Sequence, residues 1–509
     1  MVANRRNMSK NLIGTLLLGF LLVAGVVLLT AKFLSVPDNG PSKPVPLSDP
    51  DLPHDVILNP ATVAGLDELS RMFGHAGFTD LSRRQLPQGM DPAEADGLLT
   101  PAIDRLRRTL AESNAGYEFV QPPPATGDDL FDRFTLALDE FIDAYGSSDI
   151  ITGVPPVVPD SVLAGWEADF ARDPRYWELR YISKLLGGLD WSKECGASKD
   201  EMIRCEVENR QTAVGFLHQA YKSGVASSDT KLLLYTEELY SGWLAERVCI
   251  APGPVLSDDE LSALLDECLA DDPQDAWAWY LKSFSLFEHG NINDALAAME
   301  QGNAQPAFLH PKPFPLPKLL SGLNQAVPQG GAVVAGAGLV LSRDFPITYN
   351  RMIHRDLSLT LSHIDETGDL SPLDTWHKFG CRFALCWPED PLMPMLGLSY
   401  VSLVGEYMAG HTAKEGDPRR DVLKSMFSAR NEARRSLEFC NDDSVLRDDL
   451  AVLGLVGGAR GSCLAQYLQA ERQARHLAAE VLPVINDIAT VKYPELTDSA
   501  KLLAYAGPD

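Results

Sequence analysis

Hydrophobic and polar positions near the N-terminus separate into two blocks. Residues 1–10 contain three basic side chains and no acidic one, and no charged residue then occurs from Asn11 to Ala31. In a helix this uncharged stretch spans about 31 Å, close to the roughly 30 Å hydrocarbon core of a bilayer. The pattern predicts a transmembrane helix over residues 11–31. Because basic residues flank membrane helices on the cytoplasmic side, we expect residues 1–10 to be a cytoplasmic tail and the following chain to be extracytoplasmic.

A cleaved signal peptide is the alternative interpretation of this segment. The apolar region of a signal peptide usually has about 7–15 residues and ends at a small-x-small cleavage site. The uncharged run here is longer, and Leu29-Thr30-Ala31 lacks the first small residue. The sequence therefore favours a permanent membrane anchor.

Farther along the chain, apolar residues recur with the spacing of helices. Ser257 and Glu260 form the pattern of a capping box, which marks a helix start. Two segments with one apolar face each follow it, namely Leu261, Leu264, Leu265, Cys268 and Leu269, then Trp277, Tyr280, Leu281 and Phe284. Because only a short break separates the two segments, we expect an antiparallel helix pair.

Further helix starts are indicated where a capping residue precedes a proline, since the first helical turn tolerates proline. These pairs are Asp91-Pro92, Thr100-Pro101, Ser371-Pro372 and Asp417-Pro418. Strand signals are sparse, and no Asn-Gly or Asp-Gly turn joins two alternating runs. The sequence predicts an all-α fold.

Residues 271–302 resemble a tetratricopeptide repeat. The matching positions hold a large aromatic residue, a leucine, a turn glycine and two residues of the second helix; they are Trp279, Leu286, Gly290, Ala295 and Met299. Lys282 stands where the family usually has leucine, and Ser283 takes the usual small position beside it. The resemblance extends over residues 257–302.

This resemblance implies antiparallel helix pairs stacked as an α-α superhelix, whose concave face commonly binds peptides or protein helices. It implies no chemistry. We expect a linker at residues 32–60, which contains seven prolines, and an N-terminal helical region at 61–150. A tetratricopeptide-like domain at 151–310 and a C-terminal helical domain at 311–509 follow.

The charge balance narrows the range of partners. The formal net charge is -26, and the basic tail makes the remainder still more acidic. Such a surface repels nucleic acids and anionic lipid head groups, and it favours neutral, basic or metal-bearing partners, although solubility alone also accounts for it. No N-x-S/T triplet occurs beyond residue 31, which favours a bacterial periplasm over a eukaryotic secretory route.

All eight cysteines lie in the part of the chain expected outside the cytoplasm. An oxidising compartment permits disulfides there, although free cysteines are also commonly buried. The candidate pairs are Cys195 with Cys205, which flank an expected turn, and Cys249 with Cys268. Cys381 and Cys386 are expected on one helix, pointing in different directions, and should not pair.

One string copies the start of a protein-kinase catalytic loop, at His354-Arg355-Asp356. The loop also needs an asparagine five residues after the aspartate, where this chain has Leu361, and the remaining kinase signatures are missing. We therefore expect an ordinary helix with His354 and Arg355 on its polar face.

Other candidate chemistry is equally incomplete. Gly336-Ala337-Gly338 lacks the third glycine of a dinucleotide loop and is expected to be a tightly packed helix. His377 and Cys381 share a helix face, where core packing explains them better than a metal. The acidic pair Glu389-Asp390 is what a sugar-cleaving site needs, but such pairs arise readily in so acidic a chain. No catalytic residue, cofactor or metal ligand is assigned.

Two main hypotheses of function remain, with a third beside them. The leading one is a membrane-anchored, extracytoplasmic scaffold that binds proteins of the cell envelope. The alternative is an all-helical envelope enzyme acting on polysaccharide or peptide. The third is an inner-membrane subunit whose transmembrane helix recruits a specific complex.

Overall fold

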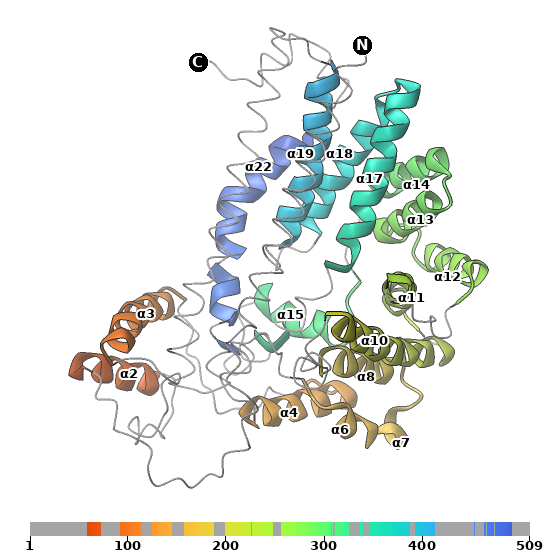
Figure 1. Cartoon of the computed structure of the whole chain (residues 1–509). Coiled ribbons are helices and arrows are strands. Elements are labelled where there is room, and N and C mark those ends of the chain that lie inside the picture. Colours follow the sequence, from red (N-terminus) through yellow and green to blue (C-terminus); the bar gives the residue numbers. More distant parts are fainter. Residues whose placement is uncertain are drawn as a thin grey trace, which may run out of the picture. The chain divides into compact units, whose positions relative to one another are not determined.

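A computed structural model describes residues 59–72, 92–113, 125–144, 157–187, 199–224, 226–247, 256–306, 308, 311–324, 336–338, 347–386, 392–412, 452, 463–464, 466–472 and 474–490. Throughout these ranges the elements are helices, which confirms the predicted all-α class (Figure 1). All belong to one compact unit, residues 58–509. The predicted transmembrane helix at 11–31 lies outside these ranges, and none of the helices within them has both the length and the apolarity that crossing a bilayer requires.

The first eight described helices run from the end of the linker to the middle of the chain. They are α2 (Pro60–Met72), α3 (Pro92–Ser113), α4 (Asp129–Ala144), α6 (Asp160–Ala164), α7 (Glu167–Phe170), α8 (Pro174–Gly187), α10 (Lys199–Lys222) and α11 (Ser228–Arg247). The later elements are α12 (Asp258–Asp271), α13 (Ala276–Glu288), α14 (Ile292–Ala304), α15 (Leu316–Asn324), α17 (Ile347–Thr367), α18 (Ser371–Leu385), α19 (Leu392–Thr412), the π-helix η3 (Leu477–Val481) and α22 (Leu482–Thr490).

Proline marks some helix starts as expected and not others. Helix α3 begins at Pro92, but the expected start at Thr100-Pro101 is wrong, because α3 continues through Pro101. Proline removes one backbone hydrogen bond there. Leu99 and Ile103, on either side of Pro101, are both buried in the core, and α3 packs against α2. In α18, Ser371 is already helical, and Asp369 accepts a hydrogen bond from its backbone N–H at 2.9 Å.

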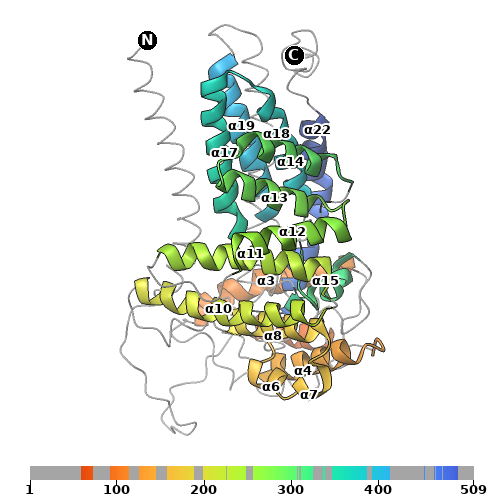
Figure 2. The same ribbon diagram turned by 90° about the vertical axis from the view of Figure 1, so that its right-hand side faces the viewer.

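Helices that follow one another in sequence pack side by side. The series α8, α10, α11, α12, α13 and α14 has each member in contact with the next, and Figure 2 shows α14 to α10 as successive steps. Helix α14 then packs against α18, and α18 against α19 and α22. Helix α17 contacts α13, α14, α18 and α19. The helices of the middle region are thus joined to those after residue 347 through α13 and α14.

Glycines bring two of the later helices into backbone contact. A Cβ atom added at Gly397 of α19 would lie 2.4 Å from the backbone nitrogen of Ala384 and 2.5 Å from the backbone oxygen of Gly380, both in α18. The Gly336-Ala337-Gly338 segment is helical and buried, and a Cβ at Gly336 would lie 2.1 Å from the backbone oxygen of Cys463. The expected role of this segment as a tightly packed helix is therefore confirmed for these three residues.

Candidate functional site

The helix pair α13–α14 contains the residues that resemble a tetratricopeptide repeat. The capping box of Ser257 and Glu260 forms at the start of α12, as predicted. Asp275 caps α13 by accepting a hydrogen bond from the N–H of Trp277 at 2.9 Å. Ala295 and Met299 of α14 are fully buried, as the pattern requires.

The turn between α13 and α14 has the geometry expected for glycine. Gly290 has a φ of +74°, in the left-handed region. Its N–H donates to the carbonyl of Phe287 at 3.0 Å, and the N–H of Asn291 donates to that of Leu286 at 2.9 Å. These two bonds make a Schellman motif, which satisfies the last carbonyls of α13 and reverses the chain.

Trp279, which the resemblance makes the packing aromatic of the helix pair, does not belong to the hydrophobic core that the structure describes. Its side chain is only half-buried and donates to the backbone oxygen of Pro273 at 3.2 Å. Of the two tryptophans of α13, Trp277 is the fully buried one, and its ring stacks on Phe308 with the centroids 5.6 Å apart. Two residues correspond to about 200° around a helix, so the two tryptophans cannot share a face. The spacing of Trp277 with Tyr280 and Phe284 was the signal in the sequence that identifies the buried one.

A polar seam joins this helix pair to α18. The hydroxyl of Tyr280 donates to Asn303 Oδ1 at 2.9 Å, and Asn303 Nδ2 donates to the carbonyl of Thr375 at 2.9 Å. Lys378 Nζ lies 2.9 Å from Glu300 Oε1. These bonds fix the position of α14 against α18.

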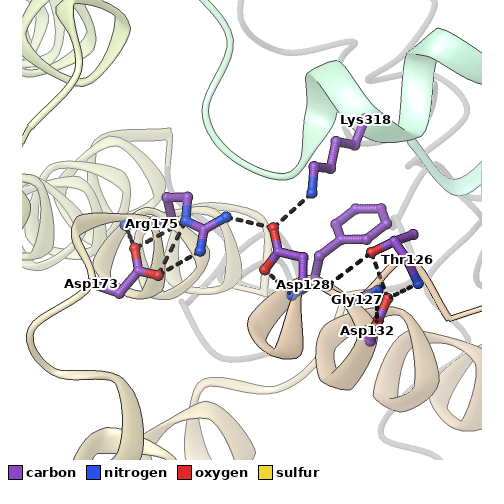
Figure 3. A network of polar contacts seen from close by, with 8 residues as sticks. Thr126, Gly127, Asp128, Asp132, Asp173, Arg175 and Lys318 are labelled. Atoms are coloured by element: carbon purple, nitrogen blue, oxygen red, sulfur yellow. Dashed lines mark hydrogen bonds and ion pairs between the residues drawn. The ribbon is translucent and has the colours of Figure 1, made fainter.

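A second group of polar residues, which we call the Asp128 junction, joins α4, α8 and α15 (Figure 3). It consists of Asp128, Asp132, Asp173, Arg175 and Lys318. Asp128 Oδ2 accepts from Arg175 Nη1 at 2.6 Å and from Lys318 Nζ at 2.7 Å, and Arg175 also pairs with Asp173 through its other nitrogens. Asp132 accepts hydrogen bonds from the N–H groups that precede α4. The junction therefore fixes the start of α4 against two helices distant in sequence.

Two aromatic rings complete the Asp128 junction. Phe131 and Phe314 meet edge to face, with centroids 5.9 Å apart. The guanidinium of Arg175 lies 4.9 Å from the centroid of Phe314, and the ammonium of Lys318 lies 4.7 Å from that of Phe131. Each cation is thus held by a carboxylate and an aromatic face together.

The electrostatic interactions in the Asp128 junction favour the ionised forms of Asp128 and Arg175. Burial acts to raise the pKa of Asp128, but hydrogen bonds from Lys318 and Arg175 outweigh it and lower the pKa to about 2. The hydrogen bond with Asp173 raises the pKa of Arg175, whereas burial lowers it. The pKa of Arg175 is raised overall. A carboxylate with so low a pKa is a poor general acid or base near neutral pH. The arrangement is suited to holding helices together.

Glu178 of α8 binds the backbone of Phe314, whose ring belongs to the junction, but its environment is different. Its side chain is 4 % exposed, and its two oxygens accept from Thr230 Oγ1 at 2.5 Å and from the backbone N–H of Phe314 at 2.6 Å. Burial raises the pKa of Glu178 to about 7, against the lowering effect of these bonds. That pKa suits proton transfer, but both oxygens are occupied by donors of the protein itself, so the geometry is that of a buried structural carboxyl.

The sequence analysis did not identify the residues of the Asp128 junction or Glu178. Only part of this arrangement has a signal in the sequence. The acids around Asp128 are typical of a helix start, which was a usable signal. The contact between Asp128 and Lys318 could not be predicted from local sequence, since the two residues lie 190 positions apart.

An open hollow beside α7 is lined by Glu167, Ala168, Asp169, Ala171 and Arg172. Its two acids are each bound to an arginine: Asp169 lies 2.8 Å from Arg133, and Glu167 lies 3.5 Å from Arg180. They do not form a facing pair of unbound carboxylates, which glycoside cleavage needs. The acidic pair Glu389-Asp390 lies outside the described residues.

The kinase-like string lies within α17. Arg355 is exposed, as expected, and His354 is partly buried, where burial lowers its pKa. Asp356 is fully buried and binds Arg355, with Oδ1 2.8 Å from Arg355 Nε. His377 Nε2 lies 2.9 Å from the backbone oxygen of Ile488, in agreement with a role in packing. Among the described residues no three His, Cys, Asp or Glu side chains gather in a way that would hold a metal.

The cysteines give a mixed outcome. Cys205 is disulfide-bonded, while Cys195 lies outside the described residues, so their pairing stays a prediction. The expected bridge between Cys249 and Cys268 is absent, because Cys268 is a reduced thiol. Cys268 points into the core from the same face of α12 as its buried leucines, which explains its burial. Cys381 and Cys386 are also reduced, so they do not pair with each other, as predicted.

Comparison with known proteins adds no relative: no family model, no curated protein and no solved structure matches this chain.

Proposed function

We propose that this chain is a membrane-anchored, extracytoplasmic scaffold that binds protein partners through tetratricopeptide-like helix pairs. The anchor is the uncharged segment at 11–31, and the basic tail before it gives the orientation. The location that fits best is a bacterial periplasm, with the folded part held away from the bilayer by the linker at 32–60.

The observation that carries the proposal is the unbroken packing of α10, α11, α12, α13 and α14, each against the next. Helix pairs that stack in this way bury one another's apolar faces and leave an extended surface for a partner. The hairpin of α13 and α14, closed at Gly290 and packed through Ala295 and Met299, agrees with the family resemblance at those positions.

The charges of the last three helices of this series, α12, α13 and α14, constrain the partner's chemistry. Residues 256–304 contain eleven acidic side chains, and Lys282 is the single lysine or arginine among them. Lys282 itself lies 3.0 Å from Asp266 of α12, so its charge is partly neutralised. A neutral or basic protein surface therefore fits α12, α13 and α14 better than nucleic acid or anionic lipid.

Site-specific photo-crosslinking of the full chain in its native membrane tests this proposal. A photoreactive residue at Asp259 of α12 or Asp294 of α14, both exposed, should give discrete adducts with protein, whereas one at Leu136 of α4 should not. Adducts at all three positions alike, or at none, would contradict a partner surface on the series.

Two matched variants test whether the packed pair of α13 and α14 forms the binding surface. A Cβ at Gly302 would lie 2.7 Å from the ring of Tyr280 and 3.2 Å from the backbone oxygen of Ala276, so Gly302→Leu should push α14 away from α13 and remove the adducts. Ala297→Leu adds the same side chain at an exposed site of α14 and should leave them intact. Equal adduct yields in both variants would show that the helix pair does not form the binding surface.

A further inference from the structure

Asp356 is a buried carboxyl whose surroundings do not suit its charged form. Its side chain has no exposed surface, and its Oδ2 atom is buried without a hydrogen-bond partner. Its Oδ1 atom accepts one bond, from Arg355 Nε at 2.8 Å. An ionised carboxylate in the interior needs bonds to both oxygens to offset the loss of water, and here one oxygen lacks them.

Arg355, which binds Asp356, also lies close to a second carboxylate. The Arg355 side chain is 42 % exposed, and its Nη1 atom lies 3.4 Å from Glu288 Oε1 at the end of α13. Arg355 thus shares its charge between a buried and an exposed carboxylate, and solvent screens it. Glu288 adds a like charge near Asp356, which further disfavours ionisation.

Among the described residues, the charged groups that act on the pKa of Asp356 are Arg355, which lowers it, and Glu288, which raises it. Helix α18 presents Trp376, whose Nε1 donates to Thr360 Oγ1 at 2.9 Å, and α19 presents Tyr400, whose hydroxyl donates to Asn350 Oδ1 at 2.6 Å. The acid of α14 nearest the seam, Glu300, is bound by Lys378. Burial accordingly dominates, and it raises the pKa of Asp356 to about 7 despite Arg355.

We propose that Asp356 is a proton-linked switch in α17: it is neutral in the packed helix, and its ionisation loosens the contact between α17 and α13. The proton passes to bulk water when the helix opens, and the new carboxylate then gains the solvent contact that it lacks in the interior. Because α13 belongs to the helix series and α17 packs on α18 and α19, the switch acts where the two groups of helices meet. This regulation goes beyond the proposed scaffold function and does not depend on it.

Hydrogen–deuterium exchange of the full chain, followed at residues 347–367 and corrected for the intrinsic rate, tests the switch. A carboxyl that titrates near pH 7 when packed and near its ordinary value when exposed should increase the opening constant of α17 by on the order of tenfold between pH 6 and pH 8. Asp356→Asn cannot ionise, so its opening constant should stay unchanged over this range. Glu366→Gln, at an exposed acid of the same helix, should behave like the unmodified chain.

A tenfold change that persists in Asp356→Asn would overturn the proposal, and so would its absence from the unmodified chain. If Asp356→Asn does not fold, Arg355→Gln decides, because Arg355 is the cation bound to Asp356 and lies at the surface. Its loss should move the midpoint of the opening transition to higher pH. A midpoint that stays in place in Arg355→Gln would show that Asp356 does not control α17.

Discussion

Lys318 Nζ lies 2.7 Å from Asp128 Oδ2, although 190 positions of chain separate the two residues. The contact binds α15, which follows residue 311, to the start of α4, in the region 61–150. Arg175 of α8 reaches the same oxygen of Asp128 from the region between them. One carboxylate therefore connects the three helical regions that the sequence suggested as separate, and their stabilities should be coupled through it.

Asp128→Asn should destabilise the protein at neutral pH by about 1 kcal/mol after allowance for solvent screening. The folded state lowers the pKa of Asp128 from 3.8 to about 2. Its contribution is therefore fully present above about pH 4 and is lost as the pH falls toward 2. Chemical unfolding at pH 7 and pH 3 measures this difference. The neighbouring Asp129→Asn, which changes an exposed carboxylate at the first residue of α4, should have little effect at either pH.

Trp277→Ala and Trp279→Ala should have very different effects on stability. Trp277 is fully buried against Phe308 and Phe383, so its loss leaves a large cavity and should cost about 3–5 kcal/mol. Trp279 is half-buried, and its truncation removes one hydrogen bond and a contact with Lys282, a loss of about 1 kcal/mol. Thermal unfolding of both variants compares them, and equal losses would contradict the packing described for α13.

Gly397→Ala should destabilise the contact of α18 with α19. The added methyl would lie 2.4 Å from the backbone nitrogen of Ala384, and backbone atoms cannot move aside as a flexible side chain does. We expect a loss of about 1–3 kcal/mol from overpacking. Gly215→Ala in α10 is the matched control: nothing lies within 4 Å of its Cβ, so the better helix propensity of alanine should make it neutral or stabilising. The denaturant midpoints of the two variants measure this difference in stability.

Information within one helix or one turn was readable from the sequence, and contacts across the fold were not. The capping box at Ser257, the buried face of α12 and the left-handed Gly290 follow from local rules of spacing and backbone sterics. The family pattern pointed to Trp279, yet the local apolar spacing placed Trp277 in the core. The partners of Asp128 and Glu178 depend on how distant helices meet, which no local pattern encodes.

The membrane anchor at 11–31 leads to a prediction about topology. A reporter that is active only outside the cytoplasm, fused after Pro60, should be active, because the basic tail keeps residues 1–10 inside. The chain should also remain with the membrane after alkaline extraction, since the uncharged run is long enough to span the bilayer. Release of a shortened soluble product that begins near Lys32 would show instead that the segment is cleaved.

Glu178→Gln should remove a dependence of stability on pH. In the folded state the pKa of Glu178 is raised from 4.5 to about 7, so the folded chain retains a proton that the unfolded chain releases between these values. Stability consequently falls as the pH rises from 4.5 to 7 and is constant with respect to this group above that window. The cost at pH 8 reaches at most about 3 kcal/mol.

Glutamine fits the same bonds without the charge. Its carbonyl can accept the N–H of Phe314, and its amide can donate to Thr230 Oγ1, whose hydroxyl then turns to Ser227 Oγ at 2.9 Å. We therefore expect Glu178→Gln to be more stable than the unmodified chain at pH 8 and similar to it at pH 4.5. Glu178→Ala should be less stable at both pH values, because the N–H of Phe314 loses its acceptor. Unfolding curves at the two pH values separate the effect of charge from that of hydrogen bonding, and a Gln variant that is less stable at pH 8 would show that the carboxylate itself stabilises the fold.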